Sequence, residues 1–215
     1  GVGTVSGTSI SFGTAVEFEA GNTSHISIAF DSNSNKVVIA YRDGGNSDYG
    51  TAIVGTVSGT SISFGTAVVF ESASTSYTAT VFDSNLNKIA IAYRDGGNSD
   101  YGTAIVGTVS GTSISFGTAT VFESGTALEF GGAFDSSNNK VFFSYKDADN
   151  SNIGTAVVGT ISGTSISFGT PVVFSGTDAV SAVIGAVFDS NANKIVLAYN
   201  NATDTSTDAV VGTVS

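Results

Sequence analysis

The sequence predicts an all-β protein, a four-bladed β-propeller in which each blade is a four-stranded antiparallel meander of about 52 residues. The main observation is a segment of thirteen residues that recurs, Val-Gly-Thr-(Val/Ile)-Ser-Gly-Thr-Ser-Ile-Ser-Phe-Gly-Thr. Its copies begin at Val2, Val54, Val106 and Val158, and a fifth copy starts at Val211. A second motif, Phe-Asp-Ser-x-x-Asn-Lys, occurs once per repeat, at Phe30, Phe82, Phe134 and Phe188. No window has a helical period, so we expect essentially no helix.

The first half of one repeat predicts two strands joined by a tight turn. Residues 25–30 alternate large apolar with small or polar side chains, which is typical of a strand. Residues 31–35 are Asp, Asn and Ser, which tolerate turn conformations. Residues 36–41 are rich in β-branched side chains and apolar on both faces, as in a covered strand. We expect these two strands to form the inner pair of a blade.

The second half predicts the outer pair. Residues 42–49 form a polar loop that contains glycine, and residues 50–57 follow as a third strand. A tight turn at residues 58–60 leads to a fourth strand, which carries Ile62, Phe64, Val68 and Phe70 on one face. Residues 71–77 are expected to be a second long loop. The alternative architecture is a β-solenoid or fibre repeat built from the same meanders.

The chain is expected to be a single repeat domain, residues 1–215. Complete blades are predicted near residues 25–70, 77–122 and 128–174. The last blade, residues 181–215, is expected to be closed by an N-terminal strand at residues 9–18. The motif phenylalanines at 30, 82, 134 and 188 are expected to occupy equivalent buried positions.

Composition excludes several classes of function. The net charge is −11 with only seven Lys and Arg residues, which argues against binding to nucleic acid or anionic membranes. No apolar run approaches the ~20 residues that span a bilayer, so membrane insertion is not expected. There is no Cys, Met or Trp. Because the chain lacks these easily oxidised side chains, we expect an extracellular, cell-surface or virion location.

The repeat resembles the repeats of β-propeller proteins of the sialidase-like and lectin-like kinds. The resemblance rests on the motif at Phe30 and its copies, which in such blades joins the two inner strands. It covers the whole chain but extends to the fold alone. The Trp-containing boxes of sialidase and WD40 blades are absent, since the chain has no Trp.

The richest candidate for a binding site is the loop Tyr-Arg-Asp-Gly-Gly-Asn-Ser-Asp-Tyr, which occurs unchanged at residues 41–49 and 93–101. It offers charge, amide and aromatic groups together, a set that can hold sugar hydroxyls and stack on a sugar face. The candidate ligand-binding residues are Arg42, Asp43, Asn46, Asp48 and Tyr49, with their copies Arg94, Asp95, Asn98, Asp100 and Tyr101. The alternative is a solvated loop whose Arg and Asp pair with each other.

No cofactor is expected, although calcium at Asp43, Asn46 and Asp48 is an alternative, because all three offer hard oxygen donors. An enzyme is not expected. His25 is the only histidine, and no nucleophile motif accompanies it.

Two functions therefore remain. The first is a non-catalytic, lectin-like module for carbohydrate recognition or adhesion, which binds glycans or a cell-surface receptor through its loops. The second is a structural repeat of an extracellular fibre, surface layer or phage tail structure that has no ligand. In either case the chain can self-associate or continue in a longer array.

Overall fold

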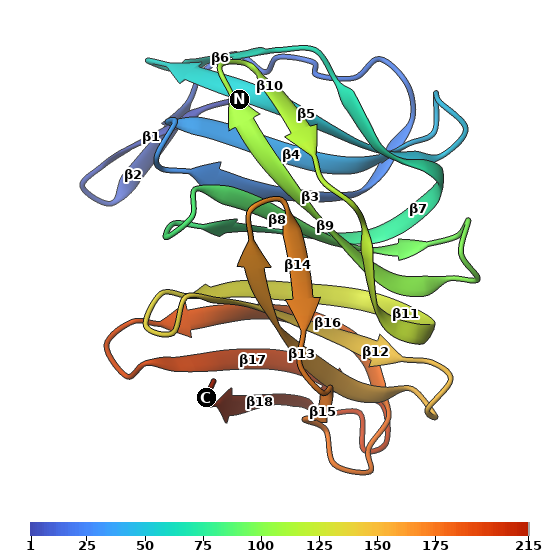
Figure 1. Ribbon diagram of the computed structural model, residues 1–215. Helices are drawn as coiled ribbons and strands as arrows, with labels where there is room; N and C mark the ends of the chain where they lie inside the picture. Colours follow the sequence, from blue (N-terminus) through green and yellow to red (C-terminus); the bar gives the residue numbers. More distant parts are fainter. Residues whose placement is uncertain (215) are drawn as a thin grey trace.

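The structure, a computed structural model, describes residues 1–214, except for the side chain of Ile184, and it is all-β with 66% strand and 0% helix (Figure 1). All the strand pairs are antiparallel. The strands are β1 (Gly3–Ser6), β2 (Ser9–Phe12), β3 (Thr23–Asp31), β4 (Lys36–Asp43), β5 (Tyr49–Ser58), β6 (Ser61–Phe64), β7 (Val68–Asp83), β8 (Lys88–Asp95), β9 (Tyr101–Ser110), β10 (Ser113–Phe116), β11 (Thr120–Asp135), β12 (Lys140–Asp147), β13 (Ile153–Ser162), β14 (Ser165–Phe168), β15 (Val172–Val173), β16 (Val180–Asp189), β17 (Lys194–Asn201) and β18 (Thr207–Gly212).

Each repeat contributes three consecutive strands that pair as a meander, for example β3–β4–β5 and β7–β8–β9. The tight turn between the first two strands forms as predicted. Asp31 Oδ1 accepts the backbone N–H groups of Asn33 and Ser34 at 2.9 and 3.0 Å, and Asn35 takes a φ of 53°. A short hairpin strand, β6, β10 or β14, then folds back on the end of the third strand. The prediction of strand-rich, antiparallel repeats is confirmed.

Two strands are much longer than predicted and belong to two repeats at once. Residues 68–74 of β7 pair with β5, and residues 75–83 pair with β8, so β7 runs unbroken through the expected loop at residues 71–77. The prediction of a loop there is wrong. β11 joins the next two repeats in the same way. The polar composition suggested a loop, but strands on either side supply hydrogen-bond partners for this backbone. The predicted fourth strand is interrupted at residues 65–67 instead.

Successive meanders pack face to face, with a face of large side chains on a face of small ones. Between the first two repeats, Ile89, Ile91 and Tyr93 of β8 share a buried cluster with Val38 and Ala40 of β4. The same arrangement follows one repeat later, where Val141, Phe143 and Tyr145 of β12 meet Ala90, Ala92, Ala104 and Val106. The inner strands β3, β7, β11 and β16 contact one another in this order. The core therefore lies between repeats and not inside them.

The hairpins that follow the third strands also touch their neighbours. A β-carbon placed on Gly13, Gly65 or Gly117 would overlap the carbonyl oxygen of Thr60, Thr112 or Thr164 in the hairpin turn of the next repeat. Glycine is required at these positions because the neighbouring backbone fills the space of a side chain. The contact recurs three times along the chain.

The four meanders form an open stack that runs from the N-terminal to the C-terminal end (Figure 1). Over the described residues no closed barrel or propeller ring is detected. Residues 9–12, which were expected to complete the last repeat, pair as β2 with β1, and β18 pairs with β17 alone. The two ends of the stack lie apart, so the predicted closure by residues 9–18 is absent from this structure.

The openness of the stack explains why the phenylalanine prediction is wrong. Phe82, Phe134 and Phe188 are half-buried and pack against the preceding repeat. Phe30 occupies the equivalent place in the first repeat, where no repeat precedes it, and is 57% exposed. The fully buried aromatic residues are Tyr41, Tyr93 and Tyr145 of the second strands, together with Phe143.

We expect substitution of Phe82 by Ala to lower the free energy of unfolding by about 2–3 kcal/mol, somewhat less than for a fully buried Phe. Phe30→Ala, its matched control, should change stability by about 0.5 kcal/mol or less, because this ring faces solvent. Urea denaturation of both variants measures the difference. Equal losses would indicate that Phe30 is covered in solution, as a closed ring requires.

Candidate functional site

The two identical loops lie between the second and third strands of the first two repeats, and in each loop the Arg pairs with an Asp of the same loop. Arg42 Nη2 lies 2.5 Å from Asp48 Oδ2, and Arg94 Nε lies 2.8 Å from Asp100 Oδ1. The hydrogen bond from Arg42 lowers the pKa of Asp48. The guanidinium groups that were predicted to hold a ligand are therefore partly committed to shaping their own loops.

The remaining predicted residues also make contacts within the loop. Asp43 Oδ1 accepts the N–H of Gly45 at 3.0 Å, and Asp95 does the same with Gly97. The backbone of Asn46 bonds to the carbonyl of Asp43 and accepts from Tyr49, both at 3.1 Å. The side chains of Asn46 and Asn98 are exposed, and Tyr49 and Tyr101 are half-buried. Within residues 1–214, the amides and the half-buried tyrosines are the groups of this loop with no side-chain hydrogen bond, and Arg42 Nε also lacks a partner.

The third and fourth repeats lack the Arg–Asp pair, in line with their divergent sequences. Lys146 Nζ contacts the carbonyl of Ser181 at 3.4 Å instead. In the fourth repeat Asn201 takes the place of the turn Asp, and its Nδ2 donates to Asp178 and Asp208 at 3.2 and 3.1 Å. Any site that needs the Arg is thus limited to the first two repeats.

A buried tyrosine of the second strand precedes the loop in each of the first three repeats. Tyr41, Tyr93 and Tyr145 donate their hydroxyls to Glu19, Glu71 and Glu123 at 3.4, 3.1 and 2.8 Å. Burial and the nearby carboxylates raise the pKa of each tyrosine. Burial, followed by the charge of Asp95, also raises the pKa of Glu71. These carboxylates hold the buried hydroxyls, so their role is structural.

A second group of side chains, which sequence reasoning missed, lies beside these loops. His25, Tyr77 and Glu129 sit at equivalent β-bulges in the first strands, and we call them the bulge row. Their φ angles are 50°, 52° and 54°. Left-handed backbone is costly for residues other than glycine, by about 1–2 kcal/mol each. The residues that precede them, Ser24, Ser76 and Leu128, pair with Arg42, Arg94 and Lys146 of the second strands.

The bulge row places an imidazole, a phenol and a carboxylate at equivalent positions of three repeats. The rings of His25 and Tyr77 are 4.6 Å apart. Burial, then the charge of Arg42, lowers the pKa of His25, while Glu129 acts in the opposite direction. The histidine is therefore neutral near pH 7 and can donate or accept a hydrogen bond. The available sequence signal was that the repeats differ at this position while most of their strand residues recur.

No group of three potential metal-ligating His, Cys, Asp or Glu residues occurs in the part of the chain that the structure describes. Asp43 and Asp48, the carboxylates of the calcium alternative, are engaged by Gly45 and Arg42. Over residues 1–214 no helix has the length and apolarity needed to span a membrane.

Comparison with known proteins leaves the class open. No family model matches the chain, and no curated protein matches it significantly. The resemblance to β-propeller repeats thus stays a prediction, and function must be argued from the geometry.

The half-buried Glu71 should make stability depend on pH. Its pKa, like that of Asp95, is raised on folding, so the folded state binds protons more readily than the unfolded state. The stability that Glu71 contributes should rise as pH falls from neutral towards 4.5, the ordinary pKa of Glu, whereas His25, whose pKa is lowered, acts in the opposite direction. Glu71→Gln should stabilise the protein modestly at pH 7 and weaken this dependence, whereas Glu17→Gln, at an exposed position, should do neither. Thermal unfolding across this range measures the effect, and a slope unchanged by Glu71→Gln would contradict it.

Proposed function

We propose that the chain is a non-catalytic structural repeat module, a rigid unit of an extracellular fibre, surface layer or phage tail structure. The observation that carries this proposal is the pairing of Arg42 with Asp48 and of Arg94 with Asp100. The most conspicuous repeated loop uses its charges to fix its own shape. A repeat that is retained for stacking needs no ligand, and its loops need only be stable and soluble.

The open stack supports the fibre alternative over the four-bladed ring. Each meander has the strand order of a propeller blade, and its inner strand contacts the next inner strand, as blades do. A four-bladed ring would also require the first and last repeats to meet. The exposure of Phe30 at one end and of Val211 at the other argues for an extended arrangement instead.

A glycan array probed with the full chain, with and without calcium, tests this proposal. We expect no retained glycan in either condition. Arg42→Ala combined with Arg94→Ala should lower the free energy of unfolding by at most about 2 kcal/mol, since exposed ion pairs contribute ~0–1 kcal/mol each. Lys146→Ala, which breaks no ion pair, should have no effect. Glycan retention that disappears in the double variant would overturn the structural proposal.

The second candidate is the lectin-like module, in which glycans or a cell-surface receptor bind on the edge formed by the loops and the bulge row. The observation that favours it is the strained backbone at His25, Tyr77 and Glu129. Strained residues cluster at functional sites, where the surrounding structure holds them. Here they place the rings of His25 and Tyr77 4.6 Å apart, and the charges of Arg42 and Arg94 act on the histidine.

His25→Gly separates the two candidates. Glycine adopts positive φ without strain, so the substitution should raise the free energy of unfolding by up to about 1 kcal/mol. Loss of the contact with the Tyr77 ring offsets part of this increase. A variant that keeps its stability and loses glycan or cell binding would support the lectin-like module. Ser24→Gly, in the same strand but outside the bulge, is the control and should be destabilising.

A further inference from the structure

Two contacts recur at every junction between successive hairpins. The first is the backbone contact of Thr60, Thr112 and Thr164 with Gly13, Gly65 and Gly117. The second is an aromatic contact between the hairpin and the segment that leads into its repeat. It joins Phe18 to Phe64, Phe70 to Phe116 and Phe122 to Phe168, with ring centroids 5.8, 5.7 and 5.2 Å apart.

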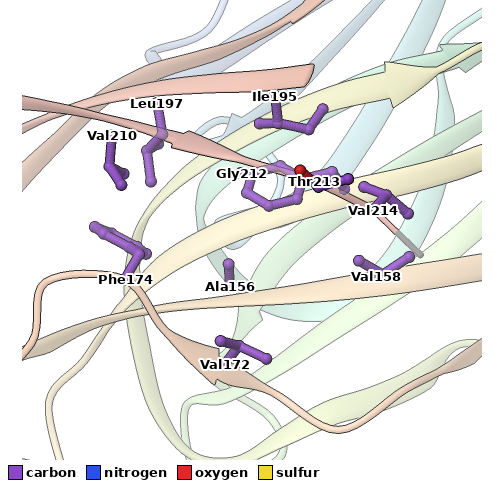
Figure 2. A pocket seen from close by; sticks show the side chains of 11 residues that line it. Ala156, Val158, Val172, Phe174, Ile195, Leu197, Val210, Gly212, Thr213 and Val214 are labelled. Atoms are coloured by element: carbon purple, nitrogen blue, oxygen red, sulfur yellow. The ribbon is translucent and has the colours of Figure 1, made fainter. Parts of the chain in front are cut away.

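At the C-terminal end, residues 1–214 provide no second partner for either contact. A β-carbon on Gly169, the next glycine in the series, would meet only the carbonyl oxygen of Val158, at 3.9 Å. Phe174, the next aromatic residue, lines an open apolar pocket of about 180 Å³ between the third and fourth repeats (Figure 2). Other walls of this pocket are Phe142, Val158, Ile195, Leu197 and Val214.

The N-terminal end of the chain carries a hairpin of the kind that the C-terminal end lacks, and the apolar side chains of this hairpin are exposed. The β1–β2 hairpin has the sequence of the later hairpins, and it carries Thr8, Ile10 and Phe12 at the equivalent positions. Ile10 is 56% exposed and Phe12 is 70% exposed. Two counterparts of Ile10, Ile114 and Ile166, are only 3% and 5% exposed, because they pack between repeats. Ile62 and the counterparts of Phe12, which are Phe64, Phe116 and Phe168, are half-buried.

We propose that the β1–β2 hairpin of one chain docks in the apolar pocket of a second copy, so that copies associate head to tail. Phe12 lies against Phe174, and Thr8 lies over Gly169. The association repeats the junction that the chain already forms three times, so its shape and chemistry are established within the molecule. This inference rests on the proposed structural function, because it continues the stack from one chain to the next.

The flat faces of the two ends fit the same arrangement. The last repeat leaves its face of small side chains uncovered, with Val187 and Val211 exposed. The first repeat leaves Ile28 and Phe30 exposed on its inner strand. Inside the chain the counterpart of Phe30, Phe82, is packed against the preceding repeat. A second copy supplies that repeat.

One strand must be exchanged for the hairpin to dock. Residues 3–6 and residues 212–215 both read Gly-Thr-Val-Ser, so they compete for one position in the junction. β2 pairs Phe12 with Gly3 and Ile10 with Val5. Pairing β2 with residues 212–214 of the other copy, which the structure describes, replaces these partners with identical ones. The exchange preserves the hydrogen bonds, and the burial of Ile10 and Phe12 provides the gain.

Two variants block the two ends separately. Phe12→Asp places a charge on the hairpin, and Leu86→Asp, at an exposed turn, is its matched control. Gly169→Leu fills the space that Thr8 must occupy, while the chain itself leaves that space open. Each blocked variant should fold with a normal β-sheet circular dichroism spectrum.

Sedimentation velocity of the full chain over a wide concentration range provides the test. The unmodified chain and Leu86→Asp should form a concentration-dependent series of oligomers, and each blocked variant should be monomeric. An equimolar mixture of Phe12→Asp and Gly169→Leu should give dimers and nothing larger, since each retains one functional end. The glycan array tests the structural function without reference to these ends, so the two proposals can fail independently.

Two results would overturn the proposal. The first is an unmodified chain that stays monomeric at all concentrations. If the Gly169→Leu variant then also melts at a lower temperature than the unmodified chain, the hairpin docks within its own chain and closes a ring. The second is a mixture of the two blocked variants that contains only monomers, which would assign any association of the unmodified chain to other surfaces.

Discussion

The packing of a large-residue face on a small-residue face is the interaction on which the whole stack depends. In β4 and β8 the second strand places Ile and Tyr on one face and Val or Ala on the other, so the sheet has two unlike faces. Close packing at the spacing of stacked sheets is achieved when bulky side chains meet small ones. Tyr93 reaches the cluster of Val38 and Ala40, and Tyr145 reaches that of Ala90 and Ala92. The alternation therefore gives the stack a direction and leaves unlike surfaces at its two ends.

Features set by local chemistry were predictable from the sequence. The turn at Asp31 and its copies forms because a carboxylate accepts neighbouring N–H groups, and the period of two in residues 25–30 marks a strand wherever it occurs. Pairing across repeats was not predictable in the same way. Residues 71–77 have the composition of a loop, and only the neighbouring strands β5 and β8 make them a strand. Likewise, the exposure of Phe30 depends on the absence of a neighbour, which its own sequence does not encode.

Only part of the candidate site was predictable from the sequence, for similar reasons. Composition and repetition identified the loops of Arg42 and Arg94, because a set of charge, amide and aromatic groups is recognisable in sequence. The pairing of each Arg with Asp48 or Asp100 depends on the left-handed backbone of these aspartates, at φ of 63° and 64°. The bulge row has no motif, since a β-bulge is a mismatch in pairing between two strands. Its residues became recognisable once the register of β3 and β4 was known.

The strands that belong to two repeats have a consequence for how the protein comes apart. In helical solenoids, neighbouring repeats touch through side chains, and the array can lose units from its ends one after another. Here β7 and β11 carry a continuous hydrogen-bond ladder through each boundary they cross. Removing one unit strips the edge strand from the next and exposes its backbone. The first three repeats, which share one sheet, are thus expected to unfold together. The fourth forms a separate three-stranded sheet, joined to the third repeat by apolar packing and a single bridge between Ile153 and Ala179, and is the repeat expected to separate first.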